Sequence, residues 1–234
     1  MKHKKHIFFD LDRTIWDFDK NAEETIAELY VEFNLNQVGI DSFDDFFVKY
    51  EEVNEQCWEQ YRNGQLAKHQ LRSIRFEKTL THFYVQDEVL AERLGIAYLK
   101  RCPLKTNLIQ GSHEVLSALR EKFQLHIITN GFEETQHIKL TNCNLNQYFD
   151  VIITSEKAQA KKPYPAIFDF AINNAKCTIA DAVMIGDDHA ADIHGAHDYG
   201  IESIWFNRNK VQKKSLPSSS REINELSELL PIFF

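Results

Sequence analysis

Near its amino terminus the chain reads IFFDLDRT over residues 7–14. Three apolar residues are followed directly by two aspartates, Asp10 and Asp12, with one residue between them. A short apolar run without alternation is typical of a strand that is buried on both faces of a parallel sheet. The stretch therefore predicts a buried strand whose carboxyl end carries two carboxylates that can point into the same space. For the pattern alone, a surface turn is the alternative.

Four later apolar runs have the same form, and stretches with helical periodicity separate them. The later predicted strands span residues 125–128, 151–153, 182–185 and 201–206, and the predicted helices span residues 112–122, 133–143, 166–175 and 190–199. This alternation predicts an α/β fold, a doubly wound parallel sheet of Rossmann-like form with right-handed crossovers. Polar groups at the carboxyl ends of such strands meet at one edge, where these sheets bind ligands.

The pattern changes after the first strand, because residues 19–102 carry helical periodicity and no clear strand. The longest predicted helix covers residues 43–61 and begins at a cap formed by Asp41 or Ser42. Near the end of the chain, residues 221–230 are amphipathic and predict a surface helix. We expect two domains: a core formed by residues 1–18 and 103–234, and a small helical cap formed by residues 19–102.

The composition is that of an ordinary globular chain, in which 43% of the 234 residues are hydrophobic and 26% are charged. The net charge of −8 has the wrong sign for long-range attraction of nucleic acid or an acidic membrane surface. We therefore expect no nucleic acid and no membrane partner. An anionic substrate must instead be bound by local positive groups.

The cysteines and the apolar runs bear on the compartment. The four cysteines are scattered without a Cys-x-x-Cys pair, and no apolar run is long enough for a signal peptide or a membrane span. Free thiols in a reducing compartment are the expected state. We expect a cytoplasmic protein that is a monomer or a weak homodimer.

A second acidic group follows the predicted strand over residues 182–185. The chain there reads Gly186-Asp187-Asp188, and Asp192 comes four residues later. Because this strand and the first one end at the same edge, carboxylates from both are expected to meet. Hard oxygen ligands of this kind suit Mg²⁺. Capping of the next helix is the alternative role for Asp187 and Asp188.

Two further segments carry groups that can bind an anion. Thr129-Asn130-Gly131 ends the predicted strand over residues 125–128 and offers a hydroxyl, an amide and turn N–H groups. Lys162 precedes Pro163 and supplies a positive charge ahead of a predicted helix. The alternatives are a plain turn for the first segment and a solvated surface lysine for the second.

In this order, the four segments resemble the haloacid dehalogenase-like (HAD) hydrolase superfamily. The shared pattern is Asp-x-Asp-x-Thr, then Thr after a second strand, then Lys-Pro, then Gly-Asp-Asp with a further Asp. The resemblance covers residues 3–18 and about 103–207, and the helical insert lies where this family places a small cap. Asp12 favours a phosphatase, because dehalogenase members lack the second carboxylate.

The finer pattern is similar to the pyrimidine 5′-nucleotidase branch of that superfamily. It rests on residues 128–132 with Gln136, on residues 148–150, on Lys162-Pro163 with Ile167-Phe168, on Gly186-Asp187 with Asp192-Ile193, and on Asp17-Phe18. The implied substrate is a pyrimidine nucleoside 5′-monophosphate, a small phosphorylated metabolite.

The resemblance implies a role for each matching residue. Asp10 is the nucleophile that forms an aspartyl-phosphate, and Asp12 is the general acid and base. Asp10, Asp187 and the backbone carbonyl of Asp12 are the implied ligands of Mg²⁺. Thr129 and Lys162 are expected to hold the phosphoryl group during catalysis.

Other residues are expected to support the site. Asn130 and Gly131 are expected to help Thr129 bind the phosphoryl group, and Asp192 is expected to steady the loop or a metal-bound water. Asp188 stands where the family often has Ser or Thr, and a place behind the metal ligands is expected for it. Trp16, near the core–cap junction, is a candidate for stacking on a nucleobase.

The predicted function is thus Mg²⁺-dependent hydrolysis of a phosphomonoester through an aspartyl-phosphate, with a nucleoside 5′-monophosphate as substrate. One alternative keeps the same core and acts on a sugar phosphate or phosphoglycolate, as a phosphatase or a mutase. Another belongs to a different class, a catalytically silent binding or signalling module with clustered acids and a lysine. Asp12 and the cap argue against the silent module.

Overall fold

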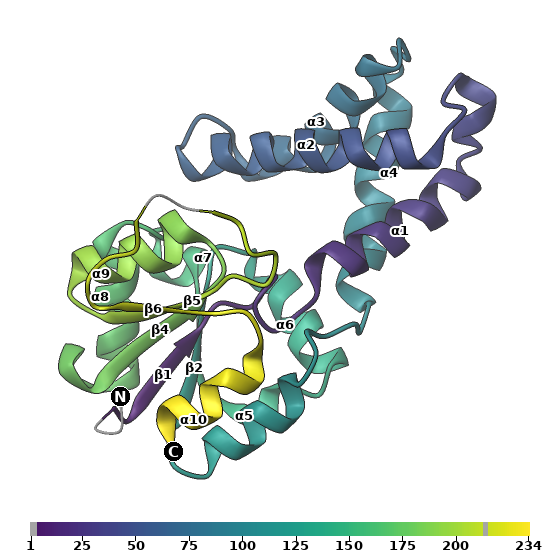
Figure 1. Cartoon of the computed structure of the whole chain (residues 1–234). Helices are drawn as coiled ribbons and strands as arrows, with labels where there is room; N and C mark the ends of the chain where they lie inside the picture. Colours follow the sequence, from purple (N-terminus) through teal and green to yellow (C-terminus); the bar gives the residue numbers. More distant parts are fainter. Residues whose placement is uncertain (1–3, 213–214) are drawn as a thin grey trace. The chain divides into compact units, whose positions relative to one another are not determined.

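A computed structural model describes residues 4–212 and 215–234. The chain divides into two compact units, which we call the core unit (Met1–Phe18 with Thr106–Phe234) and the helical unit (Asp19–Lys105). Figure 1 shows the strands gathered in the first unit and only helices in the second. The helical unit is therefore an insertion that follows the first strand of the core.

The core unit is built on one parallel sheet. Within the residues that the structure describes, the strands are β1 (His6–Phe9), β2 (Gln124–Thr129), β3 (Phe149–Thr154), β4 (Ala182–Gly186), β5 (Glu202–Phe206) and β6 (Ser220–Ile223). Their order is β3-β2-β1-β4-β5-β6, and every pairing is parallel. The predicted doubly wound sheet is confirmed, and the chain changes direction across the sheet between β1 and β4. Open α/β sheets bind ligands at such a switch point.

Helices cover both faces of this sheet. They are α5 (Ser112–Arg120), α6 (Glu133–Asn142), α7 (Ser155–Ala158), α8 (Pro165–Ala175), α9 (Gly195–Tyr199) and α10 (Leu229–Phe233), with 3₁₀ turns η3 (Asn146–Tyr148), η4 (Ile179–Asp181) and η6 (Leu226–Glu228) and a π-helical turn η5 (His189–His194). Helices α8 and α9 lie on one face, whereas α5 and α10 lie on the other (Figure 1). The central strands are buried between these layers, which explains their largely apolar sequences.

The end of the chain differs from the sequence prediction. The expected surface helix over residues 221–230 is wrong, because residues 220–223 form β6 at the edge of the sheet beside β5. A short 3₁₀ turn and α10 follow. Helical periodicity could not reveal this strand, since its pairing with β5 depends on a partner that is distant in sequence.

The helical unit contains α1 (Phe18–Glu32), α2 (Phe43–Arg62), α3 (Lys68–His82) and α4 (Glu88–Arg101), with 3₁₀ turns η1 (Leu35–Val38) and η2 (Cys102–Leu104). The long predicted helix is confirmed as α2. Of its two candidate caps, Ser42 is the one used, because its side chain accepts a hydrogen bond from the Asp45 amide at 3.2 Å. Across residues 4–212 and 215–234, none of the helices is both long enough and apolar enough to span a bilayer.

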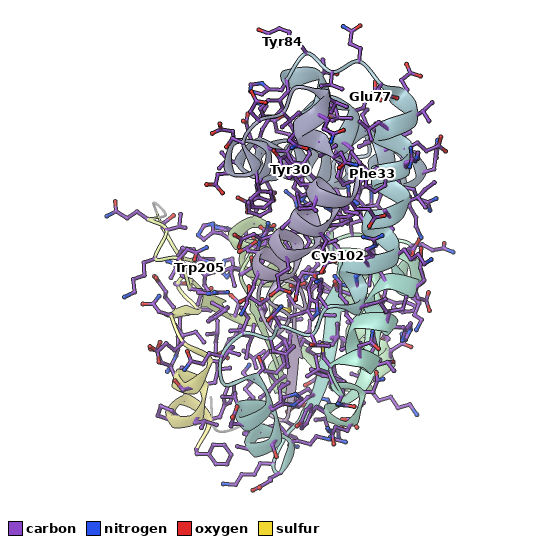
Figure 2. The ribbon with its side chains drawn as sticks, turned by 90° about the vertical axis from the view of Figure 1, so that its right-hand side faces the viewer. Tyr30, Phe33, Glu77, Tyr84, Cys102 and Trp205 are labelled. Atoms are coloured by element: carbon purple, nitrogen blue, oxygen red, sulfur yellow. The ribbon has the colours of Figure 1, made fainter. Side chains whose placement is uncertain are left out.

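Aromatic side chains fill the interior of the helical unit. Tyr50 lies 5.2 Å from Phe76 and 5.8 Å from Tyr98 between ring centroids, so α2, α3 and α4 share one aromatic core. Figure 2 shows Tyr30 among packed side chains and Tyr84 at a tip of the unit, where it is 95% exposed. The apolar face of α2 is thus explained by packing within this unit.

Candidate active site

Asp10 is the first residue after β1 and lies at the centre of the sheet edge. Its amide donates to the carbonyl of Ile185 at 2.8 Å, which extends the parallel pairing of β1 with β4 by one step. This backbone bond fixes where the side chain emerges. Only 10% of the Asp10 side chain is exposed, and its Oδ1 lies 2.6 Å from the ammonium of Lys162.

The ammonium of Lys162 is surrounded by oxygen atoms. Its Nζ lies 2.6 Å from Asp10 Oδ1, 2.6 Å from Asp192 Oδ1 and 2.7 Å from the carbonyl oxygen of Ile128. Asp10 Oδ1 and the Ile128 carbonyl accept hydrogen bonds from this ammonium, and Asp192 Oδ1 forms an ion pair with it. Burial opposes the charge of Lys162, but Asp10 and Asp192 outweigh that effect and raise its pKa. Lys162 is therefore a buried cation, and the surface alternative is wrong.

Asn130 holds this lysine from the neighbouring strand end. Its Oδ1 accepts a hydrogen bond from the Lys162 amide at 2.8 Å, and its Nδ2 donates to the Lys162 carbonyl at 3.0 Å. The predicted contact of this amide with substrate is therefore corrected, since the side chain is engaged by the backbone of Lys162. Asn130 instead sets the position from which the lysine reaches Asp10.

Asp187 and Asp192 come from the end of β4 and from η5. The hydroxyl of Thr14 donates to Asp187 Oδ1 at 3.3 Å, and the Trp205 indole donates to the Asp187 carbonyl at 2.9 Å. Asp192 is fully buried, and its Oδ2 accepts from the Asp188 amide at 3.0 Å. A Cβ at Gly186 would lie 2.1 Å from Asp192 Oδ2, so this glycine leaves the space that the carboxylate occupies.

Asp188 has a local role. Its Oδ1 accepts from the amides of Ala190 and Ala191, each at 2.9 Å, so its side chain caps η5. Helix capping, the alternative considered from the sequence, therefore applies to Asp188. Asp187 is left to face the other carboxylates.

Asp10, Asp187 and Asp192 form a compact acidic cluster. One carboxylate oxygen from each lies within 4.8 Å of the others. Burial, followed by repulsion from Asp10, raises the pKa of Asp187 well above its ordinary value, and burial raises the pKa of Asp192 to about 7. Burial also raises the pKa of Asp10, although Lys162 opposes this. Three carboxylates facing a single ammonium have the charge and the hard oxygen donors that fit Mg²⁺.

The geometry brings Asp192 closer to the candidate metal centre than the sequence indicated. The sequence placed Asp10 and Asp187 among the metal ligands and Asp192 behind them, yet all three contribute oxygens to the cluster. At the same time Asp192 Oδ1 contacts Lys162. Asp192 therefore links the lysine to the acidic cluster.

The second aspartate of the first segment, Asp12, is held by α6. Its Oδ1 lies 2.5 Å from the ammonium of Lys139, and its Oδ2 accepts from the Gln136 amide at 2.8 Å. The same Gln136 nitrogen donates to Thr129 Oγ1 at 2.7 Å. A Cβ at Gly131 would lie 2.2 Å from Gln136 Nε2, so Gly131 provides space for this side chain.

Lys139 was not identified from the sequence, and Gln136 entered only through the family resemblance. The sequence does place Gln136 and Lys139 together, because residues three apart on a helix lie on the same face. Helix α6 directly follows the Thr129 segment, so its first residues lie near the same sheet edge. What the sequence could not show is that this face turns toward Asp12.

Trp16 lies inside the core unit. It is fully buried, its ring centroid is 4.2 Å from Lys139 Nζ and 6.2 Å from the Phe18 ring, and its backbone bridges to Asp12 and Leu108. A stacking platform for a nucleobase needs a free ring face. The predicted stacking role of Trp16 is therefore corrected to packing beneath Lys139.

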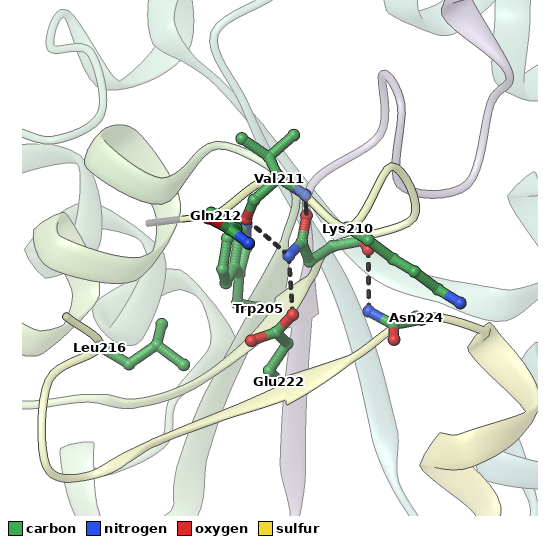
Figure 3. A pocket seen from close by; sticks show the side chains of 8 residues that line it. Trp205, Lys210, Val211, Gln212, Leu216, Glu222 and Asn224 are labelled. Atoms are coloured by element: carbon green, nitrogen blue, oxygen red, sulfur yellow. Dashed lines mark hydrogen bonds between the residues drawn. The ribbon is translucent and has the colours of Figure 1, made fainter. Parts of the chain in front are cut away.

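A cavity of about 540 Å³ adjoins the end of β5, as Figure 3 shows. The Asn207 amide donates to the Val211 carbonyl at 3.0 Å and to Glu222 Oε1 at 2.7 Å, and the Asn224 amide donates to the Asn207 carbonyl at 2.9 Å. Because these polar groups bond to one another, we interpret them as holding the loop after β5.

Comparison with known proteins shows the family of this chain. The sequence profile of the haloacid dehalogenase-like hydrolases matches residues 7–206. Pyrimidine 5′-nucleotidase YjjG of Escherichia coli is 29% identical over 224 residues, which are 95% of this chain and 95% of that protein. A glyceraldehyde 3-phosphate phosphatase of Pyrococcus abyssi is 31% identical over 235 residues, which are 97% of this chain and 93% of that protein.

A solved structure is similar as well. The protein YfnB from Bacillus subtilis, solved bound to magnesium, matches with a TM-score of 0.88 at 26% identity and covers 98% of each chain. The match extends over both the sheet and the helical insertion, since it includes nearly the whole chain.

Proposed function

Because this chain belongs to the haloacid dehalogenase-like hydrolases, we propose that it is a Mg²⁺-dependent phosphomonoester hydrolase with Asp10 as its nucleophile. The observation that carries this proposal is the pair Asp10 and Asp12 at one strand end, each held by its own lysine. Two carboxylates in separate environments can take separate roles in one reaction. Asp10 and Asp12 are accordingly assigned to attack and to proton transfer.

In the first step an Asp10 carboxylate oxygen attacks phosphorus, and the bond from phosphorus to the leaving oxygen breaks. The protonated carboxyl of Asp12 gives its proton to that leaving oxygen. In the second step Asp12 takes a proton from a water molecule, whose oxygen attacks the phosphorus of the aspartyl-phosphate. Phosphate leaves, and the Asp10 carboxylate is restored.

Thr129 is oriented to donate a hydrogen bond to the phosphoryl group. Its Oγ1 accepts from Gln136 Nε2 at 2.7 Å and from the Gly131 amide at 3.1 Å. With both lone pairs engaged, the hydroxyl proton is left for an acceptor on the substrate. Lys162 supports the same step by placing a positive charge beside Asp10.

Asp10, Asp187 and Asp192 offer the side-chain oxygens for Mg²⁺, and the Asp12 carbonyl is proposed as a further ligand. When bound, the ion supplies positive charge that offsets repulsion between an anionic phosphoryl group and the carboxylates. The acidic cluster fits this ion because buried Asp10 and Asp192 and half-buried Asp187 each place a carboxylate oxygen within 4.8 Å of the others.

For the substrate we propose a pyrimidine nucleoside 5′-monophosphate. The support is the similarity to the nucleotidase of Escherichia coli over nearly the whole chain. A sugar phosphate or another small phosphate ester is the second candidate, supported by the similarity to the glyceraldehyde 3-phosphate phosphatase. Both candidates use the same core chemistry and differ in the leaving group.

A substrate panel separates the two candidates. Purified protein with Mg²⁺ is assayed for phosphate release from UMP, dUMP, dTMP, glyceraldehyde 3-phosphate and phosphoglycolate. The highest kcat/KM is expected for a pyrimidine nucleotide. Release from the sugar phosphates without release from the nucleotides would reject the nucleotidase assignment and keep the phosphatase.

The variant Asp10→Asn tests the chemistry itself. It removes the nucleophile, so kcat on p-nitrophenyl phosphate is expected to fall by at least about 10³-fold. The matched control is Asp150→Asn, since Asp150 pairs with Arg120 at the surface, and its kcat is expected to remain unchanged. The silent binding module would be favoured if the wild-type protein released no phosphate and Asp10→Asn changed nothing except metal binding.

A further inference from the structure

The Asp12 carboxylate is held at both of its oxygens by one face of α6. Oδ1 lies 2.5 Å from Lys139 Nζ, and Oδ2 lies 2.8 Å from Gln136 Nε2. The two partners are well buried, because Lys139 is 4% exposed and Gln136 is fully buried. An aspartate on a free loop has no such restraint, and its side chain turns among rotamers.

The two partners are themselves fixed. The Lys139 ammonium lies 4.2 Å from the ring centroid of the buried Trp16, a cation–π contact. The Gln136 nitrogen faces two oxygens, Asp12 Oδ2 and Thr129 Oγ1. The opposite amide orientation would place Gln136 Oε1 against the carboxylate, so the orientation is set electrostatically.

We propose that Lys139 and Gln136 are positioning residues that hold the Asp12 carboxylate in the orientation needed for proton transfer, an inference that rests on the proposed phosphatase function. A proton moves efficiently only within hydrogen-bond reach of a correctly placed carboxyl group. Two contacts on two oxygens restrict both the translation and the rotation of that group. The Trp16 ring contacts the Lys139 ammonium and so helps to fix the position of this lysine.

This role differs from that of Lys162. Lys162 contacts the nucleophile Asp10, whereas Lys139 contacts Asp12, so each lysine is assigned to one of the two carboxylates. A residue that only orients Asp12 affects turnover and leaves ground-state binding unchanged. Gln136 also contacts Thr129, so loss of its amide is expected to affect kcat and KM together.

The first test is Lys139→Met, which keeps the length of the side chain and removes the ammonium. Its kcat on p-nitrophenyl phosphate with Mg²⁺ is expected to fall by about 10–100-fold with KM unchanged, because a small displacement of a catalytic group has an effect of this size. Lys139→Arg is expected to restore part of the loss, since a guanidinium can still bond the carboxylate. The control is Lys157→Met, where an exposed lysine pairs with Glu133 and no loss is expected.

The second test is a double-mutant cycle with Asp12→Asn. If Lys139 acts through Asp12, Lys139→Met causes little further loss of kcat in the Asp12→Asn background. Equal losses in both backgrounds would overturn the inference. Where Lys139→Met fails to fold, Gln136→Leu is carried through the same cycle, and its loss of kcat is expected to be smaller in the Asp12→Asn background, where only the part that acts through Thr129 remains.

The outcomes separate this inference from the function on which it rests. A wild-type protein that cleaves no phosphomonoester overturns the proposed function and the inference together. An active wild-type protein in which Lys139→Met changes only KM, or changes neither parameter, overturns the inference alone.

Discussion

Both units of this protein bury cations, and Lys162 in the core unit and Arg75 in the helical unit have different surroundings. Lys162 in the core unit has a side chain that is 2% exposed, and it contacts the carboxylates of Asp10 and Asp192. Arg75 in the helical unit is 4% exposed. Its Nη1 donates to Asn54 Oδ1 at 3.0 Å, and its guanidinium lies 4.5 Å from the Tyr98 ring.

The difference shows how a buried charge indicates function. Arg75 contacts a neutral amide and an aromatic face, which are partners that stabilise a packed interior. Lys162 lies in a cluster where carboxylates outnumber the cation, an arrangement that is unfavourable without a further positive charge. The core unit therefore concentrates negative charge at the sheet edge, whereas the helical unit surrounds its buried Arg75 with a neutral amide and an aromatic ring.

The largest expected effect comes from removing the Lys162 ammonium, and Arg75→Met is the matching substitution in the helical unit. Lys162→Met leaves Asp10 and Asp192 buried without their ammonium, so a loss of about 3–5 kcal/mol in stability is expected, together with a fall in kcat of about 10²-fold or more. Arg75→Met is expected to leave kcat unchanged and to cost no more than about 1–2 kcal/mol. Urea unfolding and steady-state kinetics measure both quantities. Similar effects of the two substitutions on kcat would contradict the contrast.

The same substitution at two glycines sharpens the comparison. A Cβ at Gly186 would lie 2.1 Å from Asp192 Oδ2, and a Cβ at Gly95 would lie 2.6 Å from the backbone oxygen of Arg72. Gly186→Ala is expected to displace Asp192 from Lys162 and lower kcat by about 10-fold or more. Gly95→Ala separates α3 from α4 and is expected to cost about 1–3 kcal/mol of stability with kcat unchanged. A normal kcat for folded Gly186→Ala would disprove the role of this close approach.

One buried acidic group in each unit is expected to respond differently to pH. Burial raises the pKa of Asp192 to about 7, so the folded protein retains a proton that the unfolded chain releases near pH 4. This contribution to stability is present below about pH 4 and is lost as the pH rises to about 7. In the helical unit, burial raises the pKa of Tyr50 to about 12, so Tyr50 stays neutral across that interval.

Mg²⁺ is expected to reverse this loss, because a cation stabilises the ionised carboxylates. At a concentration 100-fold above its Kd, Mg²⁺ should raise the Tm at pH 8 by about 5–10 °C relative to protein in EDTA, and by less at pH 5. Differential scanning calorimetry at both pH values measures the shift. Asp187→Asn should reduce it, whereas Asp150→Asn should leave it intact. An equal shift at pH 5 and pH 8 would argue against binding at the acidic cluster.

The smallest expected effect lies in the helical unit. Ser42→Ala removes the side chain that caps α2, so a loss of about 1 kcal/mol is expected. The kcat should not change, because the Ser42 side chain stabilises only the start of α2. Thermal unfolding and steady-state kinetics provide the measurement. Ser42→Asp serves as the matched control and should retain the stability, since aspartate also caps helices.

Much of this fold could be predicted from the sequence. The apolar runs predicted the first five strands, and helical periodicity predicted α2 with a cap at one of two residues. These patterns are local, since buried strands need uninterrupted apolar residues and packed helices need one apolar face. Strand β6 was missed because its polar sequence acquires its conformation from pairing with β5.

The candidate site was predicted in part. Asp10 and Asp187 were expected at one edge, because the ends of parallel strands meet there, and Lys162 was expected beside the phosphoryl group only from the family resemblance. Lys139 was not predicted, since an isolated lysine on a helix reads as a solvated side chain. The contacts of Asn130 and Trp16 were also assigned incorrectly, because a polar or aromatic side chain does not reveal which neighbour it will meet.

The sequence by itself determined the parallel sheet, the inserted helical region and the set of acidic groups at the strand ends, since each depends on periodicity or on position relative to a strand. Only the tertiary structure decided which lysine holds which aspartate. Lys162 reaches Asp10 because Asn130 fixes its backbone, and Lys139 reaches Asp12 because α6 turns one face inward. Those pairings join residues more than 120 positions apart, and their charges interact only after the chain has folded.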